Sequence, residues 1–219
     1  EAIFPMSTSR GCPFSCSFCT REEGRSWEPR SLDAVERDAR FLRQQGVQCL
    51  VIVDPIANLD AERFEELLRR IEALGLRVRF PNGLRVDRLR DESIPRLARM
   101  TDELCFSVES TAPRVLDELI GKRLDLSRVE PILLACQRAE LPVSIHYIIG
   151  APGELAEEVN RTLGDAAQWL DRFSARPLVQ AYVPRARFAL APDQDHLPDD
   201  FYASFGDDSA AQGLPGRPR

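Results

Sequence analysis

Three cysteines near the start of the chain, Cys12, Cys16 and Cys19, have the spacing that most directly indicates chemistry. They form a C-x3-C-x2-C pattern. A cubane iron–sulfur cluster usually takes one thiolate for each of its irons. Three thiolates can therefore hold such a cluster and leave one iron open to another ligand. An iron with an open coordination position indicates a reactive cluster.

The residues around these cysteines resemble the signature of the radical S-adenosylmethionine (SAM) enzymes, C-x3-C-x-aromatic-C, with Phe18 in the aromatic position. Residues 7–13, STSRGCP, match the usual lead-in to that signature. The resemblance implies a [4Fe–4S] cluster bound by Cys12, Cys16 and Cys19. It also implies that the amino and carboxylate groups of SAM chelate the fourth iron, with Phe18 near the adenine.

Two other uses of the cysteines are open. A tetrahedral zinc site needs a fourth protein ligand, but the two histidines, His146 and His196, are far away in the sequence. Disulfides cannot pair three cysteines among themselves, and apolar surroundings indicate that the remaining ones are buried packing residues: Cys49, Cys105 and Cys136. A reducing compartment fits this cysteine usage better.

The composition is that of a globular protein. The chain has 219 residues, of which 43% are hydrophobic and 29% charged, and this suits one domain with a sizeable core. No segment reaches membrane-spanning length, and the first residues lack the pattern of a secretory signal, so we expect a cytoplasmic protein. The net charge of −6 disfavours general nucleic-acid binding.

Short apolar runs alternate with longer amphipathic ones, which predicts successive β-α units and a parallel sheet, an α/β fold. The predicted strands cover residues 3–7, 49–53, 77–80, 103–108, 143–149 and 178–183. The predicted helices cover residues 32–45, 61–74, 92–99, 113–120, 127–139 and 154–173.

These units are fewer than the eight of a closed barrel. They match the partial (β/α)6 TIM-like barrel that the resemblance implies, with the cysteine loop after the first strand. An open doubly wound sheet has the same alternation and is the alternative. Residues 1–192 are assigned to the radical SAM core. Residues 193–219 are rich in Asp, Gly and Pro and are predicted to be a poorly structured tail or linker.

Functional groups in such a sheet collect at the C-terminal ends of the strands. Asp54 follows the second predicted strand, where the resemblance implies contact with an amino group of the substrate or cofactor; a turn aspartate is the simpler reading. Asn82 and Arg85 lie in a segment close to the family's N-G-x-R-x-D. Arg85 would pair with the carboxylate of SAM, and a surface ion pair is its alternative.

The fourth strand ends in a stretch that resembles the family's G-x-E-S, with Ser107 in place of the glycine. The resemblance places Ser107 and Glu109 beside the ribose and methionine parts of the cofactor. A carboxylate at an apolar strand end is costly unless paired, and a salt bridge to Arg114 or Lys122 would also satisfy it.

The fifth predicted strand runs into a stretch that resembles the family's i-i-G-x-P-G-E. The resemblance implies that Ile149 and Gly150 lie against the cofactor, and that Val183 adds backbone groups beside the adenine. His146 lies centrally in the same strand, where a buried, hydrogen-bonded core histidine is favoured over a ligand.

The resemblance as a whole implies an enzyme that reductively cleaves SAM to a 5′-deoxyadenosyl radical for hydrogen abstraction. The motifs are closest to the cobalamin-binding and methylthiotransferase-like branch, so cobalamin is a further expected cofactor and methylation or rearrangement of a metabolite an expected reaction. Because residue 1 is glutamate, an N-terminal cobalamin-binding domain could precede the chain. Expected partners are a small-molecule or peptide substrate and a flavodoxin- or ferredoxin-type electron donor.

Two rival functions stay open. The chain could be a non-catalytic iron–sulfur protein for electron transfer or sensing, which needs a fourth protein ligand and no cofactor pocket. It could also be a degenerate member that keeps the cluster without turnover.

Overall fold

The structure, a computed structural model, describes residues 1–19 and 26–183. The predicted tail at 193–219, the last residues of the predicted core and His196 lie outside these ranges. Within them, no helix combines the length and the apolar composition that crossing a membrane requires.

Parallel strands follow one another in space in the order in which they occur in the sequence. One sheet contains β1 (Ile3–Met6), β4 (Cys49–Ile52) and β5 (Arg77–Arg79), and a second contains β6 (Leu104–Glu109), β7 (Val143–Ile149) and β8 (Arg176–Ala181). A parallel bridge between Leu84, just after β5, and Phe106 in β6 joins the two.

The strand order decides between the two predicted architectures. A doubly wound sheet reverses its strand order at a switch point, whereas the described strands run β1-β4-β5-β6-β7-β8 without reversal. The prediction of a partial TIM-like barrel is therefore confirmed, and the doubly wound alternative is wrong.

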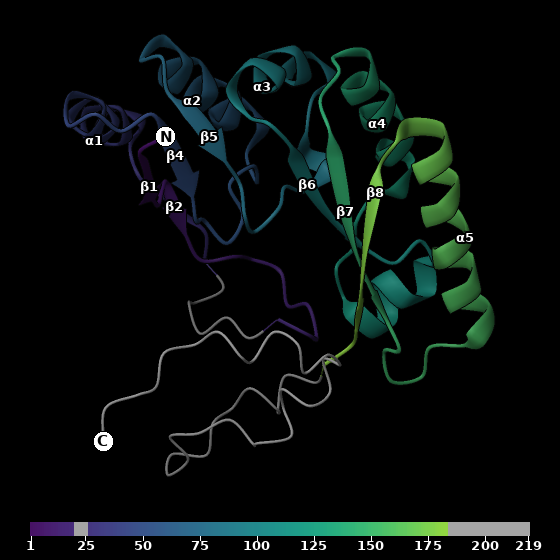
Figure 1. Cartoon of the computed structure of the whole chain (residues 1–219). Coiled ribbons are helices and arrows are strands. Elements are labelled where there is room, and N and C mark those ends of the chain that lie inside the picture. Colours follow the sequence, from purple (N-terminus) through teal and green to yellow (C-terminus); the bar gives the residue numbers. More distant parts are fainter. Residues whose placement is uncertain (20–25, 184–219) are drawn as a thin grey trace, which may run out of the picture. The chain divides into compact units, whose positions relative to one another are not determined.

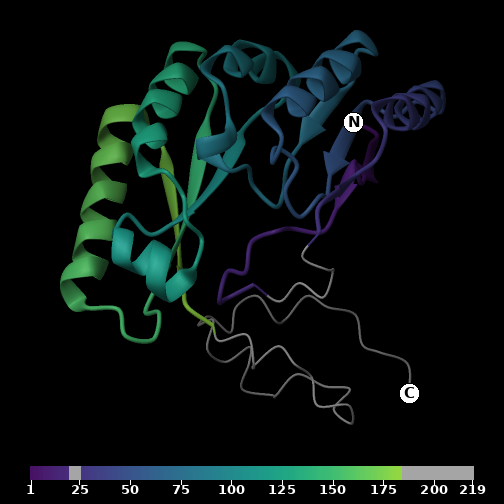
Figure 2. The same cartoon turned by 180° about the vertical axis from the view of Figure 1, so that it is seen from behind.

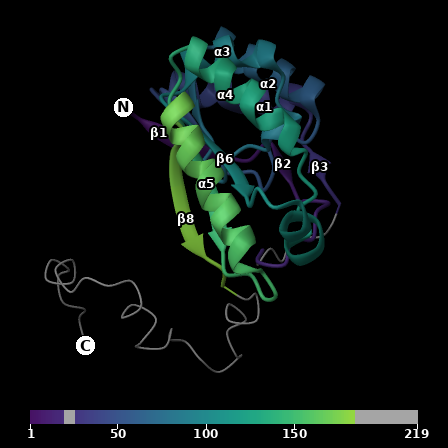
Figure 3. The same ribbon diagram turned by 90° about the vertical axis from the view of Figure 1, so that its right-hand side faces the viewer.

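The helices lie along one side of the strands, as Figures 1, 2 and 3 show from three directions. They are α1 (Leu32–Gln44), α2 (Ala61–Ala73), α3 (Ile94–Met100), α4 (Val129–Arg138) and α5 (Ala156–Phe173). Their apolar faces and one face of the strands form a common core. In β6, Leu104, Phe106 and Val108 are part of that core. Because side chains alternate along a strand, Cys105 and Ser107 face the barrel interior.

Local signals explain where the first two helices begin. The side chain of Ser31 accepts the Ala34 N–H, and that of Asp60 accepts the Arg63 N–H, so each caps its helix. Four apolar residues of α2 recur at helical spacing and all of them are buried: Phe64, Leu67, Leu68 and Ile71.

Several boundaries differ from the prediction. β8 covers Arg176–Ala181 and not 178–183, because Arg176 already pairs in register with Ser144 of β7. α5 begins at Ala156 and not at 154, because the side chain of Glu154 accepts backbone N–H groups of the preceding turn.

Some elements differ from the prediction in type, and one pair of strands is not predicted. Residues 113–120 contain a π-helical turn, Val115–Ile120, which ends at Gly121 with φ of 73°. α3 is preceded by a short 3-10 turn, Asp91–Ser93. The antiparallel pair β2 (Ser9–Arg10) and β3 (Glu28–Pro29) was missed, because two-residue strands carry no periodic pattern.

Gly83 gives a direct test of how β5 and β6 meet. Its φ is +73°, and a Cβ there would lie 2.8 Å from Ser107 Oγ and 3.3 Å from the Cys105 carbonyl oxygen. We expect Gly83→Ala to lower the free energy of unfolding by about 1–3 kcal/mol, because it adds backbone strain and a clash. Urea denaturation of the cluster-free protein measures this.

Gly164 in α5 is the matched control, since nothing lies within 4 Å of its added Cβ. Gly164→Ala should raise the free energy of unfolding by about 0.5–1 kcal/mol, as expected for a helix interior. Equal stabilities of the two variants would contradict the close approach of the strands.

Candidate functional site

One pocket lies where the cysteine loop meets the C-terminal ends of the strands. The loop contributes Cys12, Phe14, Cys16, Phe18 and Cys19, and the barrel contributes Pro55, Ile56, Asn82, Gly83, Leu84, Arg85, Ser107, Glu109 and Lys122. The three predicted cluster ligands therefore line the same pocket as five of the predicted cofactor-binding residues: Phe18, Asn82, Arg85, Ser107 and Glu109.

The three loop cysteines are half-buried free thiols. In the described residues, no three Cys, His, Asp or Glu side chains are grouped closely enough to hold one metal ion. A tetrahedral zinc site needs a fourth protein ligand, and the described residues that line the pocket include no fourth cysteine or histidine. A cubane cluster spreads its thiolate ligands over separate irons, and the donor set fits that group.

Burial raises the pKa of the Cys16 thiol, and the positive charge of Lys122 opposes the shift. Since cluster ligands are thiolates, Lys122 favours the form of Cys16 that binds iron.

The loop is also tied to the π-helical turn after β6. The N–H and the hydroxyl of Ser17 donate to the carbonyls of Ile120 and Leu119, each at 2.9 Å. Phe18 and Cys16 pack against a small apolar cluster formed by Ala112, Val115 and Ile120. In Figure 1 the loop, in purple, runs from β2 below the sheet towards this turn.

Asp54 does not line the pocket. Its buried carboxylate accepts the Thr8 N–H at 2.6 Å, the Thr8 hydroxyl at 2.6 Å and the Ser9 hydroxyl at 2.7 Å. Both oxygens are therefore engaged by the chain just before the cysteines. The structure places Asp54 as an anchor of the loop, and the expected contact with an amino group stays a prediction.

Arg85 lines the pocket, but most of its donors are used. It forms a two-bond ion pair with Asp87, at 3.0 and 2.8 Å, and also donates to the carbonyls of Lys122 and Arg123. Its guanidinium lies 4.2 Å from the ring centre of Phe14 in the cysteine loop. Arg85 therefore connects three segments, and the expected pairing with a SAM carboxylate would have to compete with Asp87.

Glu109 is buried at the end of β6, next to a bulge, with a left-handed φ of 72°. Such backbone strain in a non-glycine residue is typical of functional sites. Its carboxylate accepts a 2.8 Å bond from Lys122 Nζ, and both side chains are at least nine-tenths buried. The salt-bridge alternative to Lys122 is thus confirmed, while Arg114 pairs with Glu158.

Lys122 is the charged residue of the pocket that sequence reasoning did not assign to the site. A signal was present, because it is the single lysine in a chain with many arginines.

Asn82 and Ser107 occupy the expected edge of the pocket. The Asn82 amide donates to the carbonyls of Val53 and Asp54, at 3.0 and 3.1 Å, so it joins the ends of β4 and β5. Ser107 pairs in register with His146 of β7. His146 is half-buried, its imidazole makes no hydrogen bond in the described part of the chain, and it does not line the pocket.

Ile149, Gly150 and Val183 also lie outside the lining of this pocket. The N–H of Gly150, which has a φ of 82°, donates to the side chain of Glu154 at 2.6 Å. The Tyr182 N–H donates to the Ile149 carbonyl at 2.7 Å. These residues form the neighbouring edge of the barrel, and their contact with a cofactor stays a prediction.

Among known proteins, the chain is similar in sequence to two methyltransferases. The chain is 30% identical over 194 residues to the cytidylyl-2-hydroxyethylphosphonate methyltransferase of Streptomyces wedmorensis, covering 82% of this chain and 36% of that protein. It is 29% identical over 166 residues to an uncharacterized methyltransferase of Pyrococcus horikoshii, covering 72% and 35%. The chain thus spans little more than a third of these relatives.

Among solved structures, the fold resembles TsrM from Kitasatospora setae, a radical S-adenosylmethionine methyltransferase with cobalamin and a [4Fe-4S] cluster bound. The TM-score is 0.68 at 20% identity, covering 81% of this chain and 36% of that one. A model of the radical SAM superfamily matches residues 6–166, which include the cysteine loop, Glu109 and Gly150. The chain therefore belongs to the radical SAM superfamily.

Proposed function

We propose that this chain is the catalytic core of a radical SAM enzyme, with Cys12, Cys16 and Cys19 as the ligands of a [4Fe–4S] cluster. The observation that carries the proposal is that the three loop thiols and the buried polar residues at the strand ends line one and the same pocket. When bound, a reduced cluster supplies the electron that cleaves SAM to methionine and a 5′-deoxyadenosyl radical.

Different residues of the pocket bind different parts of SAM. Glu109 offers its carboxylate to the ribose hydroxyls or the amino group, and Lys122 brings a positive charge suited to the methionine carboxylate. Phe18 contributes an apolar surface for the adenine. Arg85 positions Phe14 and the Lys122 backbone.

The rival function, electron transfer or sensing by a fully ligated cluster, is less well supported. Among the described residues that line the pocket, no fourth cysteine or histidine is present. A cluster held there by three thiolates keeps one iron accessible to SAM.

Methyl transfer to a small molecule or peptide is the reaction class we infer, with cobalamin as a second cofactor. The support is that the Streptomyces relative is a methyltransferase and that TsrM has cobalamin bound. A cobalamin-binding domain preceding residue 1 and a flavodoxin- or ferredoxin-type electron donor belong to the same proposal.

The first test concerns the cluster ligands. After anaerobic reconstitution, the protein should bind about four irons per chain, as a cubane requires. Cys12→Ala, Cys16→Ala and Cys19→Ala should each abolish the charge-transfer absorption of the cluster. Matched controls are Cys49→Ala, Cys105→Ala and Cys136→Ala, none of which lines the pocket. Stoichiometric zinc in place of iron would rule out the proposal.

With dithionite and SAM, the reconstituted protein should release 5′-deoxyadenosine and methionine. A loaded and reduced cluster that releases neither would leave the electron-transfer or degenerate function.

The second test concerns the buried pair of Glu109 and Lys122. In cluster-free protein, Lys122→Met should lower the free energy of unfolding by about 3–5 kcal/mol, because it leaves a buried carboxylate without its partner. The double variant Lys122→Met/Glu109→Gln should lose clearly less, since it also removes the charge. Urea denaturation measures both. If the double variant is less stable than Lys122→Met, the pair does not have this role.

A further inference from the structure

The cysteine loop leaves and rejoins the fold at one narrow neck. Thr8 lies before the first cysteine, and Arg30 lies after the last. The Arg30 N–H donates to the Thr8 carbonyl at 2.9 Å. Beyond this bond, β2 and β3 pair Ser9 with Pro29 and Arg10 with Glu28. All three cluster ligands therefore lie within a loop that is closed at its base.

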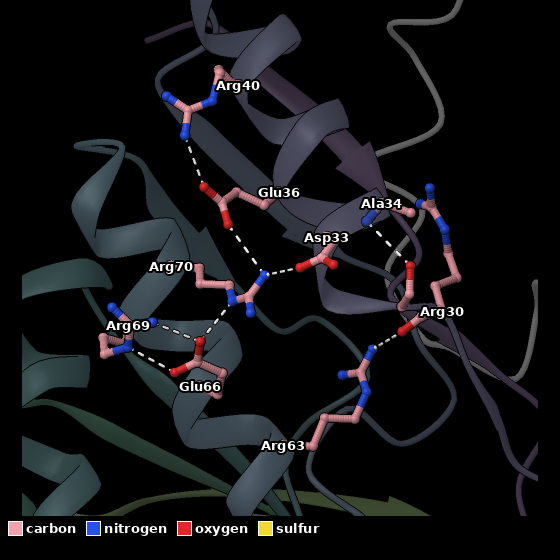
Figure 4. A network of polar contacts seen from close by, with 10 residues as sticks. Arg30, Asp33, Ala34, Glu36, Arg40, Arg63, Glu66, Arg69 and Arg70 are labelled. Atoms are coloured by element: carbon pink, nitrogen blue, oxygen red, sulfur yellow. Dashed lines mark hydrogen bonds and ion pairs between the residues drawn. The ribbon is translucent and has the colours of Figure 1, made fainter.

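Arg63, in the first turn of α2, binds both chain segments of this neck, the one that enters the loop at Thr8 and the one that leaves it at Arg30. Its Nη2 donates to the Thr8 carbonyl at 3.0 Å and to the Arg30 carbonyl at 2.7 Å. Figure 4 shows the guanidinium reaching from α2 to Arg30. The same guanidinium lies 5.9 Å from the ring centre of Trp27, which belongs to the segment that leaves the loop.

Asp54 holds the opposite side of the neck. Thr8 is fully buried, and its N–H and hydroxyl donate to the Asp54 carboxylate while its carbonyl accepts from Arg63 and Arg30. Every polar atom of Thr8 is thus bonded to a residue distant in sequence.

The helix that carries Arg63 is itself fixed in place. Asp60 caps its first turn by accepting the Arg63 N–H at 2.9 Å. One turn beyond Glu66, Arg70 donates to Glu66 within α2 and to Asp33 and Glu36 of α1, the network drawn in Figure 4. The guanidinium at the neck is therefore presented from a helix that is anchored at both ends.

One donor of the Arg63 side chain is buried and unsatisfied among the described residues, which lowers stability. Its Nη1 is buried and has no hydrogen-bond partner in the described structure. A buried donor without a partner is rare in folded proteins and calls for an explanation. The explanation here is the position of Nη2, which a shorter or non-branched donor would not reach in the same geometry.

We propose that Arg63 is a positioning residue for the iron–sulfur cluster: by joining the Thr8 and Arg30 carbonyls, it sets the width of the loop that presents Cys12, Cys16 and Cys19. This rests on the proposed function, since it requires that the loop binds a cluster. With three protein ligands only, the loop has no fourth thiolate to correct its spacing. A looser neck therefore makes the cluster more labile and its environment heterogeneous.

The test compares Arg63→Met, Arg63→Lys and the control Arg69→Met. Methionine keeps much of the apolar stem and loses the donors. Lysine keeps the charge and a donor but not the planar fork. Arg69 lies on the same helix, is exposed and pairs with Glu66, with no contact to the neck among the described residues, so its loss leaves the neck intact.

The readouts are iron content, the rate of cluster loss to a chelator, and the electron paramagnetic resonance spectrum of the reduced cluster with and without SAM. Groups that orient metal ligands typically change metal affinity by about 10–100-fold when removed. Arg63→Met should therefore lose its cluster about 10–100-fold faster and show more than one spectral species. Arg63→Lys should be intermediate, and Arg69→Met should match the parent protein.

Loss rates within twofold of the parent for both Arg63 variants, with unchanged spectra, would overturn the inference. Circular dichroism of the cluster-free proteins shows whether each variant folds; if Arg63→Met does not, the comparison of Arg63→Lys with Arg69→Met decides by the same criteria. Failure of the proposed function has a different signature, because parent and Arg69→Met would then also bind no cluster.

Discussion

The hydrogen bonds of the buried Asp54 carboxylate to Thr8 and Ser9 are the contacts on which the rest of the site depends. They connect the C-terminal end of β4 to the chain just before the first cysteine. A buried carboxylate is stable only when its oxygens are bonded, so Asp54 and the loop stabilise each other. The neck, the loop and the thiols are thereby held over the open end of the half-barrel, where the remaining pocket residues lie.

The buried charges of the pocket are likewise each paired with a group of opposite charge. Glu109 with Lys122, and Arg85 with Asp87, are buried ion pairs at the ends of strands or directly after them. Removing both charges of such a pair is often tolerated, whereas removing one is costly. The presence of these pairs is therefore better explained by the segments they hold than by stability alone. Lys122 lies beside Cys16 and Arg85 beside Phe14, so each pair links the barrel to the cysteine loop.

The features that could be predicted from the sequence are those set by residues close to one another along the chain. The alternation of apolar and amphipathic runs predicts the order of strands and helices, and the C-x3-C-x2-C spacing predicts the three thiols of the pocket. The partners of the site residues could not be predicted in this way, because Thr8 and Asp54 lie 46 positions apart and meet only when β1 pairs with β4. Arg85 illustrates the same limit: its residue type fits a carboxylate ligand, but in the fold it also donates to the carbonyls of Lys122 and Arg123, which lie 37 and 38 positions away.

The central claim is that three thiolates hold a cubane cluster whose remaining iron binds SAM in this pocket. The most direct measurement is the Mössbauer spectrum of protein reconstituted with iron-57, recorded with and without SAM. The account predicts that SAM changes the isomer shift of one iron site and leaves the others nearly unchanged, because only one iron lacks a thiolate. A fully loaded cluster whose spectrum does not respond to saturating SAM would contradict it.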